Sequence, residues 1–260
     1  MINSIPFFEK KVIFDSHAHY DDESFNEDRD ELLSTLHLNG VCGIITCGCD
    51  KASTKNAIVL AEKHDFIFAA AGIHPDCIDS GTSVADIEAL ANHEKVKAIG
   101  EIGLDYFHNS ENKTAQKELF RSQIDLAKKL SLPVIVHDRE AHEDTLNILK
   151  ETKPKGVLHC FSGSPETAKQ ILELGMYIGV GGVITFKNAK RLPEVVEMLP
   201  LDRLLVETDA PYLAPEPFRG KRNHSASIYF TAKKIAEIKK MDYMEILEIS
   251  AKNARELFNI

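Results

Sequence analysis

The chain has 260 residues, of which 43% are hydrophobic, and its formal net charge is −9. This length suits one large α/β domain, because α/β barrels reach about 250 residues as a single unit. The acidic total excludes a protein that coats nucleic acid or anionic membranes through its overall field, but it allows a local basic patch. Five cysteines, an odd number in so long a chain, indicate reduced thiols rather than a disulfide framework.

The sequence shows neither a secretory leader nor a membrane span. The polar run Glu9-Lys10-Lys11 follows the first residues at once, and no apolar run approaches the roughly 18 residues that a membrane helix needs. We therefore expect a cytoplasmic protein that does not interact with membranes.

Short apolar runs alternate with longer amphipathic ones along the chain. A first strand opens at Val12, and the pattern predicts seven more, at residues 41–46, 66–71, 96–101, 133–137, 156–159, 176–180 and 203–207. Helices are predicted at residues 23–38, 52–63, 84–92, 112–130, 140–150, 165–174, 188–198, 227–239 and 243–258. Eight such units without a linker predict a single (β/α)8 barrel of the TIM type over residues 1–260, with an extra C-terminal helix. A doubly wound open sheet is the alternative.

Ionisable residues follow six of the eight predicted strands, at the carboxyl end where such barrels carry their active sites. They are His17, His19, His74, Glu101, His137, His159 and Asp209. A single histidine of this kind is usually a hydrogen-bonded strand ending, but a whole buried set is costly unless it binds cations. The set therefore favours a barrel with a metal site over an open sheet.

Two local patterns bear on that metal site. Side chains alternate across a strand, so His17 and His19 should emerge on one side and can share an ion. The Cys47-Gly48-Cys49 pair lacks a second cysteine pair at finger-like spacing and ends an apolar strand, which indicates small buried thiols rather than a metal clip.

Six motifs occur in a fixed order along the chain. They are Asp15-Ser16-His17-Ala18-His19, Gly72-Ile73-His74-Pro75, Gly100-Glu101-Ile102-Gly103-Leu104-Asp105-Tyr106, His137-Asp138-Arg139, His159-Cys160-Phe161-Ser162-Gly163 and Glu207-Thr208-Asp209-Ala210-Pro211-Tyr212. Together they resemble the TatD family of metal-dependent deoxyribonucleases, and the resemblance spans nearly the whole chain. Related amidohydrolases often bridge two metals with a modified lysine on the fourth strand. Glu101 stands there instead, which favours the TatD branch over a dihydroorotase-like one.

The resemblance implies a site for two divalent metal ions. His17, His19 and Asp209 would hold one ion, His137 and His159 the other, and Glu101 would bridge them. Asp209 would orient or deprotonate the attacking water, with Glu101 as the second catalytic carboxylate. Glu207 would support the ligands from behind or form an ion pair inside the barrel. Mg²⁺ is the expected ion in use, and the donor types also suit Zn²⁺, Mn²⁺ or cobalt.

The implied substrate is the 3′ end of single-stranded DNA, digested in the 3′ to 5′ direction by a monomer in DNA repair. His74, Arg139 and the basic loop of Arg219, Lys221 and Arg222 are candidate phosphate-binding residues. A terminal base would stack on one of the nearby aromatic residues, Tyr106, Phe107, Phe161 or Tyr212.

Two other functions stay open. One is amide or ester hydrolysis at the same centre, including removal of an aminoacyl group from tRNA, and the other is a metal-binding module without turnover. One departure from the family pattern bears on the substrate, because His224-Ser225 stands where the family often has Glu-Pro. A carboxylate is therefore absent from that loop, while the six proposed ligand positions are intact.

Overall fold

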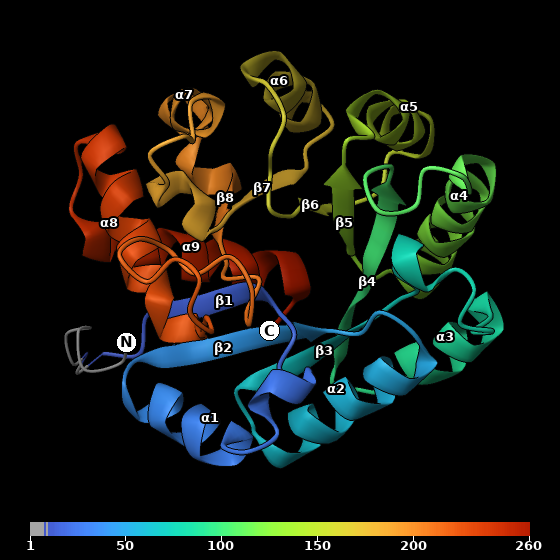
Figure 1. Ribbon diagram of the computed structural model, residues 1–260, viewed down its shortest axis with the longest axis horizontal. Helices are drawn as coiled ribbons and strands as arrows, with labels where there is room; N and C mark the ends of the chain where they lie inside the picture. Colours follow the sequence, from blue (N-terminus) through green and yellow to red (C-terminus); the bar gives the residue numbers. More distant parts are fainter. Residues whose placement is uncertain (1–7, 9) are drawn as a thin grey trace.

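Eight parallel strands form one sheet that curls into a barrel, in the order β1 to β8 (Figure 1). The computed structural model describes residue 8 and residues 10–260. The strands are β1 (Ile13–Ala18), β2 (Val41–Cys47), β3 (Ile67–Ala71), β4 (Val96–Asp105), β5 (Val134–Arg139), β6 (Gly156–Leu158), β7 (Tyr177–Val180) and β8 (Leu204–Val206). The predicted (β/α)8 barrel is thus confirmed, and the open sheet is wrong because β8 returns to β1 through a parallel bridge.

Helices connect successive strands and surround the barrel. They are α1 (Arg29–Leu38), α2 (Lys51–Lys63), α3 (Val84–Ala91), α4 (Lys113–Leu130), α5 (His142–Thr152), α6 (Pro165–Glu173), α7 (Arg191–Met198), α8 (Ile228–Lys239) and α9 (Tyr243–Phe258). Short 3₁₀ turns are η2 (Glu23–Phe25), η3 (Pro75–Cys77), η4 (Gly182–Thr185), η5 (Leu201–Arg203) and η6 (Ser225–Ser227). Within the described part of the chain, no helix has the length and apolarity needed to cross a membrane.

One predicted helix is divided in the structure. The chain forms η2 and α1 where residues 23–38 were predicted to be one helix. The Asp22 carboxylate accepts a hydrogen bond from the Ser24 backbone (2.8 Å), which starts the short turn. Arg29 then donates to the backbone oxygens of Tyr20 (2.6 Å) and Asp22 (2.9 Å). These bonds keep the intervening chain in a loop at the mouth of the barrel.

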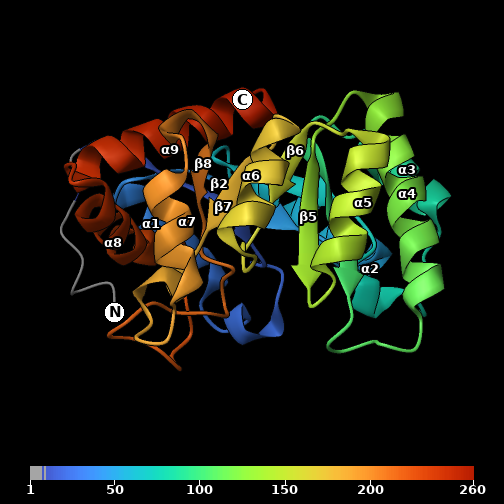
Figure 2. The same ribbon diagram turned by 90° about the horizontal axis from the view of Figure 1, so that it is seen from above.

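The interior of the barrel is apolar at the amino ends of its strands. Phe14, Ile45, Ile135 and other inward-facing residues meet one face of α9 there, and the Phe14 ring stacks on Phe258 with 6.4 Å between centroids. Figure 2 shows α9 lying across the end of the barrel away from the strand arrowheads. The extra C-terminal helix therefore closes the bottom of the barrel, and the opposite end remains for polar side chains.

The seam between β8 and β1 uses few backbone bonds. Among the described residues it consists of the bridge Ala18–Ala210 and two hydrogen bonds, from Asp209 N to His17 O (3.0 Å) and from His19 N to Ala210 O (2.7 Å). Side chains supplement them, since the buried Asp15 carboxylate accepts from the Thr208 backbone (3.0 Å) and hydroxyl (2.6 Å). The same bonds fix the backbone at three predicted metal ligands, His17, His19 and Asp209.

Candidate metal centre

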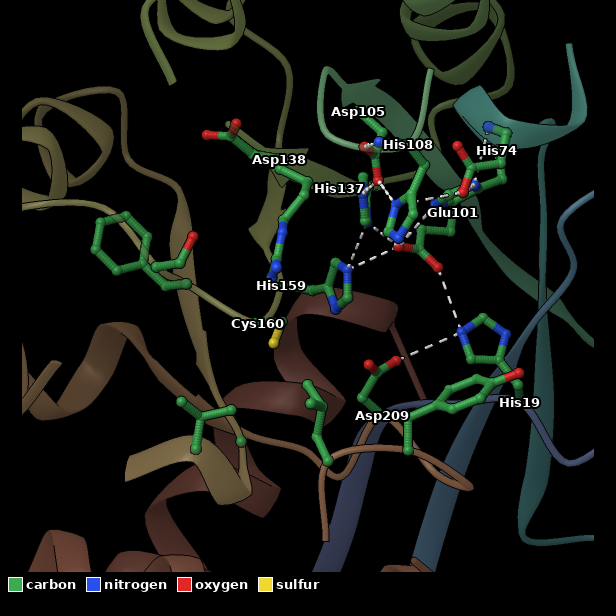
Figure 3. Close-up of a pocket in the computed structure, with 18 of the residues that line it drawn as sticks. His19, His74, Glu101, Asp105, His108, His137, Asp138, His159, Cys160 and Asp209 are labelled. Carbon is green, nitrogen blue, oxygen red and sulfur yellow. Dashed lines mark hydrogen bonds and ion pairs between the residues drawn. The ribbon is translucent and has the colours of Figure 1, made fainter. Parts of the chain in front are cut away.

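Four side chains on or just after three strands converge at the carboxyl end of the barrel, and Figure 3 shows His19, Glu101 and Asp209 among them. His17 Nε2 lies 3.1 Å from His19 Nε2, 3.3 Å from Glu101 Oε2 and 3.4 Å from Asp209 Oδ1. His19 Nε2 lies 3.3 Å and 3.5 Å from the same two oxygens. Donor atoms spaced in this way match the corners of a tetrahedron around an ion with bonds of about 2.0–2.2 Å.

A second donor set meets the other oxygen of Glu101. Glu101 Oε1 lies 2.7 Å from His137 Nδ1 and 2.7 Å from His159 Nε2. The two imidazole nitrogens are 3.4 Å apart, and His74 Nε2 is 3.6 Å from the same oxygen. Each oxygen of Glu101 therefore faces its own group of histidines. The structure brings together all six residues predicted as ligands.

Partners behind the histidines fix which nitrogen faces the centre. His19 Nδ1 lies 3.0 Å from the backbone oxygen of Cys47, which can only accept, so that nitrogen carries the proton. His137 Nε2 lies 3.0 Å from Asp105 Oδ2 and donates to it in the same way. In both rings the remaining nitrogen faces Glu101, where it holds a proton without metal and would offer its lone pair to a bound ion.

Glu207 lies behind the second donor set, next to His159. Its carboxylate accepts a hydrogen bond from the Cys160 backbone and lies 3.6 Å from His159 Nδ1 and 3.5 Å from Ser16 Oγ. The nearest charged neighbour is thus a histidine of the second donor set. This favours the supporting position over an independent ion pair inside the barrel.

The electrostatics of the centre are those of a cation site. Burial opposes the ionisation of Glu101, but the charges of His159 and His17 outweigh it and hold its pKa well below the usual range. Burial likewise opposes the charge of Asp209, and hydrogen bonds with His17 and His19 lower its pKa. Both carboxylates are therefore anionic at neutral pH. Two anions and four imidazoles that face them are the donor chemistry that divalent transition ions take, so the residues present fit two metal ions.

Asp15 and Ser225 support the loop that carries Asp209. Burial raises the Asp15 pKa to about 6, and hydrogen bonds from Ser225 and Thr208 oppose the shift. Ser225 Oγ donates to Asp15 (2.6 Å) and its backbone donates to the Tyr20 hydroxyl (2.9 Å). Ser225 thus belongs to a buried network where the family often has proline, while the neighbouring His224 is buried and burial lowers its pKa to about 4.

The predicted substrate residues fall into two groups. His74 and Arg139 line a cavity of about 1010 Å³ above the centre. Arg219, Lys221 and Arg222 are not among its lining residues. Arg222 instead forms a bidentate pair with Asp28 (2.8 and 2.5 Å) and Arg219 stacks on the Phe186 ring (4.4 Å).

Several residues of the site were not singled out from the sequence. Asp105 and Asp15 lie inside the quoted motifs, but their roles depend on partners from other strands. Lys190 and Arg191 line the cavity from the start of α7, and nothing in their local pattern separates them from other surface cations. Asp76, Asp105 and His108 form a further group of possible donors beside the centre, and two of the three are exposed.

The chain matches the family described as TatD related DNase over residues 14–259. It is 45% identical over 254 residues to a Bacillus subtilis protein described as the uncharacterized metal-dependent hydrolase YabD, covering 96% of this chain and 100% of the relative. It is 35% identical over 259 residues to the 3′-5′ ssDNA/RNA exonuclease TatD of Erwinia tasmaniensis, with 95% and 100% covered. The crystal structure of YJJV, a TatD homologue from Escherichia coli K12, superposes with a TM-score of 0.91 at 32% identity, covering 96% and 99% of the two chains.

Fold, site and relatives agree on the class of protein. A parallel barrel whose carboxyl end gathers histidines around carboxylates defines a metal-dependent hydrolase. The chain belongs to the TatD family within that class.

Proposed function

We propose that the protein is a metal-dependent phosphodiesterase that removes nucleotides from the 3′ end of single-stranded DNA. The observation that carries the proposal is the pair of donor sets on the two oxygens of Glu101. The relative named as a 3′-5′ ssDNA/RNA exonuclease supports the choice of substrate. Mg²⁺ as the working ion, a cytoplasmic monomer and a role in DNA repair belong to the same proposal.

In this proposal the first donor set would hold one ion and the second donor set the other, with Glu101 shared between them. Two bound divalent ions neutralise a scissile phosphodiester, lower the pKa of water and stabilise the leaving oxygen. Asp209 is the residue assigned to orient and deprotonate the water. Its side chain lines the cavity, is 18% exposed, and stays anionic at neutral pH.

His74 serves as a neutral hydrogen-bond donor to the substrate. Its Nδ1 accepts from the Asp76 backbone (3.1 Å), so the proton resides on Nε2, which faces Glu101 and the cavity. Burial lowers its pKa to about 3, which keeps the ring uncharged at neutral pH. A neutral Nε2–H can donate to a phosphate oxygen without competing for the metal ligands.

Digestion of single-stranded DNA labelled separately at its 5′ and 3′ ends tests the proposal. Wild-type protein is incubated with Mg²⁺, with Mn²⁺ or with chelator, beside Asp209→Asn and the exposed control Asp202→Asn. We expect stepwise loss from the 3′ end that needs metal, and a fall of about 10²–10⁴ in rate for Asp209→Asn alone, the usual contribution of a general base. DNA that stays intact with every metal contradicts the proposal and directs the next assays to aminoacyl-tRNA and cyclic amides.

A further inference from the structure

One side of the cavity is basic, and two of its three cations, Lys190 and Arg191, were not predicted from the sequence. Among the described residues that line it, the lysines and arginines are Arg139, Lys190 and Arg191. Arg139 ends β5, and the other two begin α7, so all three lie on the side of β5 and β7. Asp138, which accepts from His142 (2.7 Å), is the acidic residue on this side, while Asp21 and Asp76 near the β1 and β3 ends line the opposite side.

These three cations lack acidic partners within the described part of the chain. Other arginines have them, since Arg121 pairs with Glu151 and Arg222 with Asp28. Arg139 instead stacks on the exposed Phe107 ring at 4.9 Å. Exposed cations are often simply solvated, but three unpaired ones beside an anionic metal centre, in a chain of net charge −9, form a distinct positive surface.

The start of α7 adds to this surface. Residues 188–192 line the cavity, and no side chain caps the first turn of α7, so the backbone N–H groups of Arg191 and Leu192 remain available there, whereas Pro193 has none. Arg191 also lies near the β5–α5 loop. The Asp138 carboxylate raises the pKa of His142, and the charge of Arg191 opposes that rise. The end of β5, which carries Arg139, and the start of α7, which carries Lys190 and Arg191, are therefore neighbours.

We propose that Arg139, Lys190 and Arg191 form a track for the backbone phosphates of a single strand on the 5′ side of the scissile bond. The inference rests on the proposed function, because the metal centre takes the scissile phosphate and the rest of the strand must leave the cavity. The acidic side repels that strand, and the basic side draws it toward α7. The loop of Arg219, Lys221 and Arg222, outside the cavity lining, is then not the path of the substrate.

Binding of a fluorescently labelled single-stranded oligodeoxynucleotide tests the track. Fluorescence anisotropy in an Asp209→Asn background, where cleavage is blocked, gives Kd before and after Lys190→Gln with Arg191→Gln. We expect Kd to rise about tenfold at low salt, the scale of two charge-assisted phosphate contacts. The slope of log Kd against log salt should fall by about 1.4, because each phosphate contact on a single strand contributes about 0.7.

Lys187→Gln is the matched control, since this exposed lysine lies in the same loop but outside the cavity lining. Equal effects of Lys187→Gln and the double variant, or a larger effect of Arg219→Gln with Lys221→Gln, would overturn the track. So would an oligonucleotide that does not bind at all. Lys190→Gln with Arg191→Gln is also made in otherwise wild-type protein. Its fold-decrease in kcat/KM for the oligonucleotide should exceed its fold-decrease for bis(p-nitrophenyl) phosphate by at least about tenfold. If wild-type protein cleaves no DNA but binding still depends on both cations, the track holds and the exonuclease proposal fails.

Discussion

Glu101 connects the two halves of the metal centre. Its side chain is 4% exposed and lies within 3.3 Å of the two histidines at the end of β1 and within 2.7 Å of His137 in β5 and His159 after β6. A buried carboxylate surrounded in this way is stable only while its charge is compensated. The chain thus places an anion where two cations can share it, and other residues set the orientation of the imidazoles.

Asp105 sets one of those orientations. Its Oδ2 accepts from His137 Nε2, while Oδ1 accepts from the backbone of Phe107 (2.9 Å) and His108 (2.7 Å). Asp105→Asn removes the negative charge and allows the amide group to point toward His137. We expect Mn²⁺ affinity to fall about 10- to 100-fold, as for other partners of metal-bound histidines.

Titration calorimetry with Mn²⁺ measures this change. Asp202→Asn is the control, since Asp202 is 74% exposed and lies before β8, at the opposite end of that strand from Asp209. Unchanged affinity in Asp105→Asn would show that the β5 histidine keeps its orientation without the carboxylate. A circular dichroism spectrum like that of the wild type would exclude misfolding as the cause of a loss.

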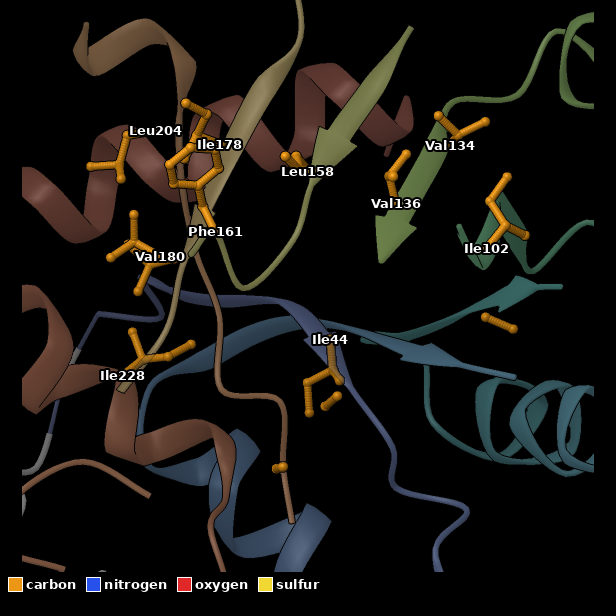
Figure 4. Close-up of a cluster of buried hydrophobic side chains, with 14 of the residues drawn as sticks. Ile44, Ile102, Val134, Val136, Leu158, Phe161, Ile178, Val180, Leu204 and Ile228 are labelled. Carbon is orange, nitrogen blue, oxygen red and sulfur yellow. The ribbon is translucent and has the colours of Figure 1, made fainter. Parts of the chain in front are cut away.

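At the scale of elements, the carboxyl end of each strand carries function while its outward face carries stability. Residues such as Ile44, Val136 and Val180 point away from the barrel axis into the layer between strands and helices (Figure 4). The next residue along β5 after Val136 is His137, which points inward. Because side chains alternate along a strand, neighbouring residues of β5 can pack against the helices and face the metal centre in turn.

Helix α9 completes the seam where β8 and β1 pair poorly. The Val206 backbone donates to Ser250 Oγ (2.8 Å), and Asn253 Nδ2 donates to the backbone oxygens of Leu201 (2.7 Å) and Leu204 (2.9 Å). These side chains satisfy backbone groups that a neighbouring strand would otherwise pair. α9 is thus part of the barrel rather than an appendage.

Ser250→Ala tests that role. The Val206 N–H is then left buried without a partner, which costs about 1–3 kcal/mol in the free energy of unfolding. Urea denaturation measures the loss, and Ser122→Ala on the exposed face of α4 is the control. A loss no larger than that of the control would mean that the seam does not depend on this bond.

Periodicity was enough to predict the barrel and the residues at its strand ends. Each strand alternates in the expected sense, so the residue after the last buried apolar position points into the centre, as His137 and His159 do. Periodicity did not reveal that β4 continues to Asp105, past the predicted end at residue 101. That extension depends on pairing with β5, where Asp105 lies opposite Arg139.

Contacts between distant segments were beyond the sequence. Arg222 and Asp28 are 194 residues apart, so the pair that occupies this arginine could not be anticipated from its basic neighbours. The position of Lys190 at the cavity depends likewise on how η4 leads into α7. Local pattern identifies which residues can bind a phosphate, and the loops of the fold decide which ones face it.

For the whole molecule, the two ends of the barrel act in opposite directions on stability. The end closed by α9 buries apolar surface, and the other concentrates carboxylates and histidines. Burial lowers the pKa of His137, but hydrogen bonds with Asp105 and Glu101 outweigh it and raise that pKa to about 10. At His19 burial is outweighed by Cys49 and by hydrogen bonds with Asp209 and Glu101, which together raise the pKa of that ring. Without metal, protons therefore supply the positive charge that Glu101 and Asp209 need.

If metal ions replace these protons, the stabilisation of the protein by metal should depend on pH. A histidine whose pKa is raised on folding stabilises the protein fully below its ordinary pKa of 6.5, and the contribution is lost as pH rises toward about 10. Metal binding requires deprotonated imidazoles, so protons compete with metal at the lower end of this window. We expect saturating Mn²⁺ to raise the unfolding temperature more at about pH 8.5 than at about pH 6.5.

Differential scanning calorimetry with Mn²⁺ and with chelator at both pH values measures the two shifts. His137→Gln should remove most of the difference between them, because it deletes a site where proton and metal exchange. His93→Gln, at a histidine paired with Glu62 on the surface, should preserve the difference. An equal shift at both pH values, or a larger one at the lower pH, would mean that the metal does not replace protons at this centre. The histidines would then be neutral before the metal arrives, and the charge of Glu101 and Asp209 would have to be compensated in another way.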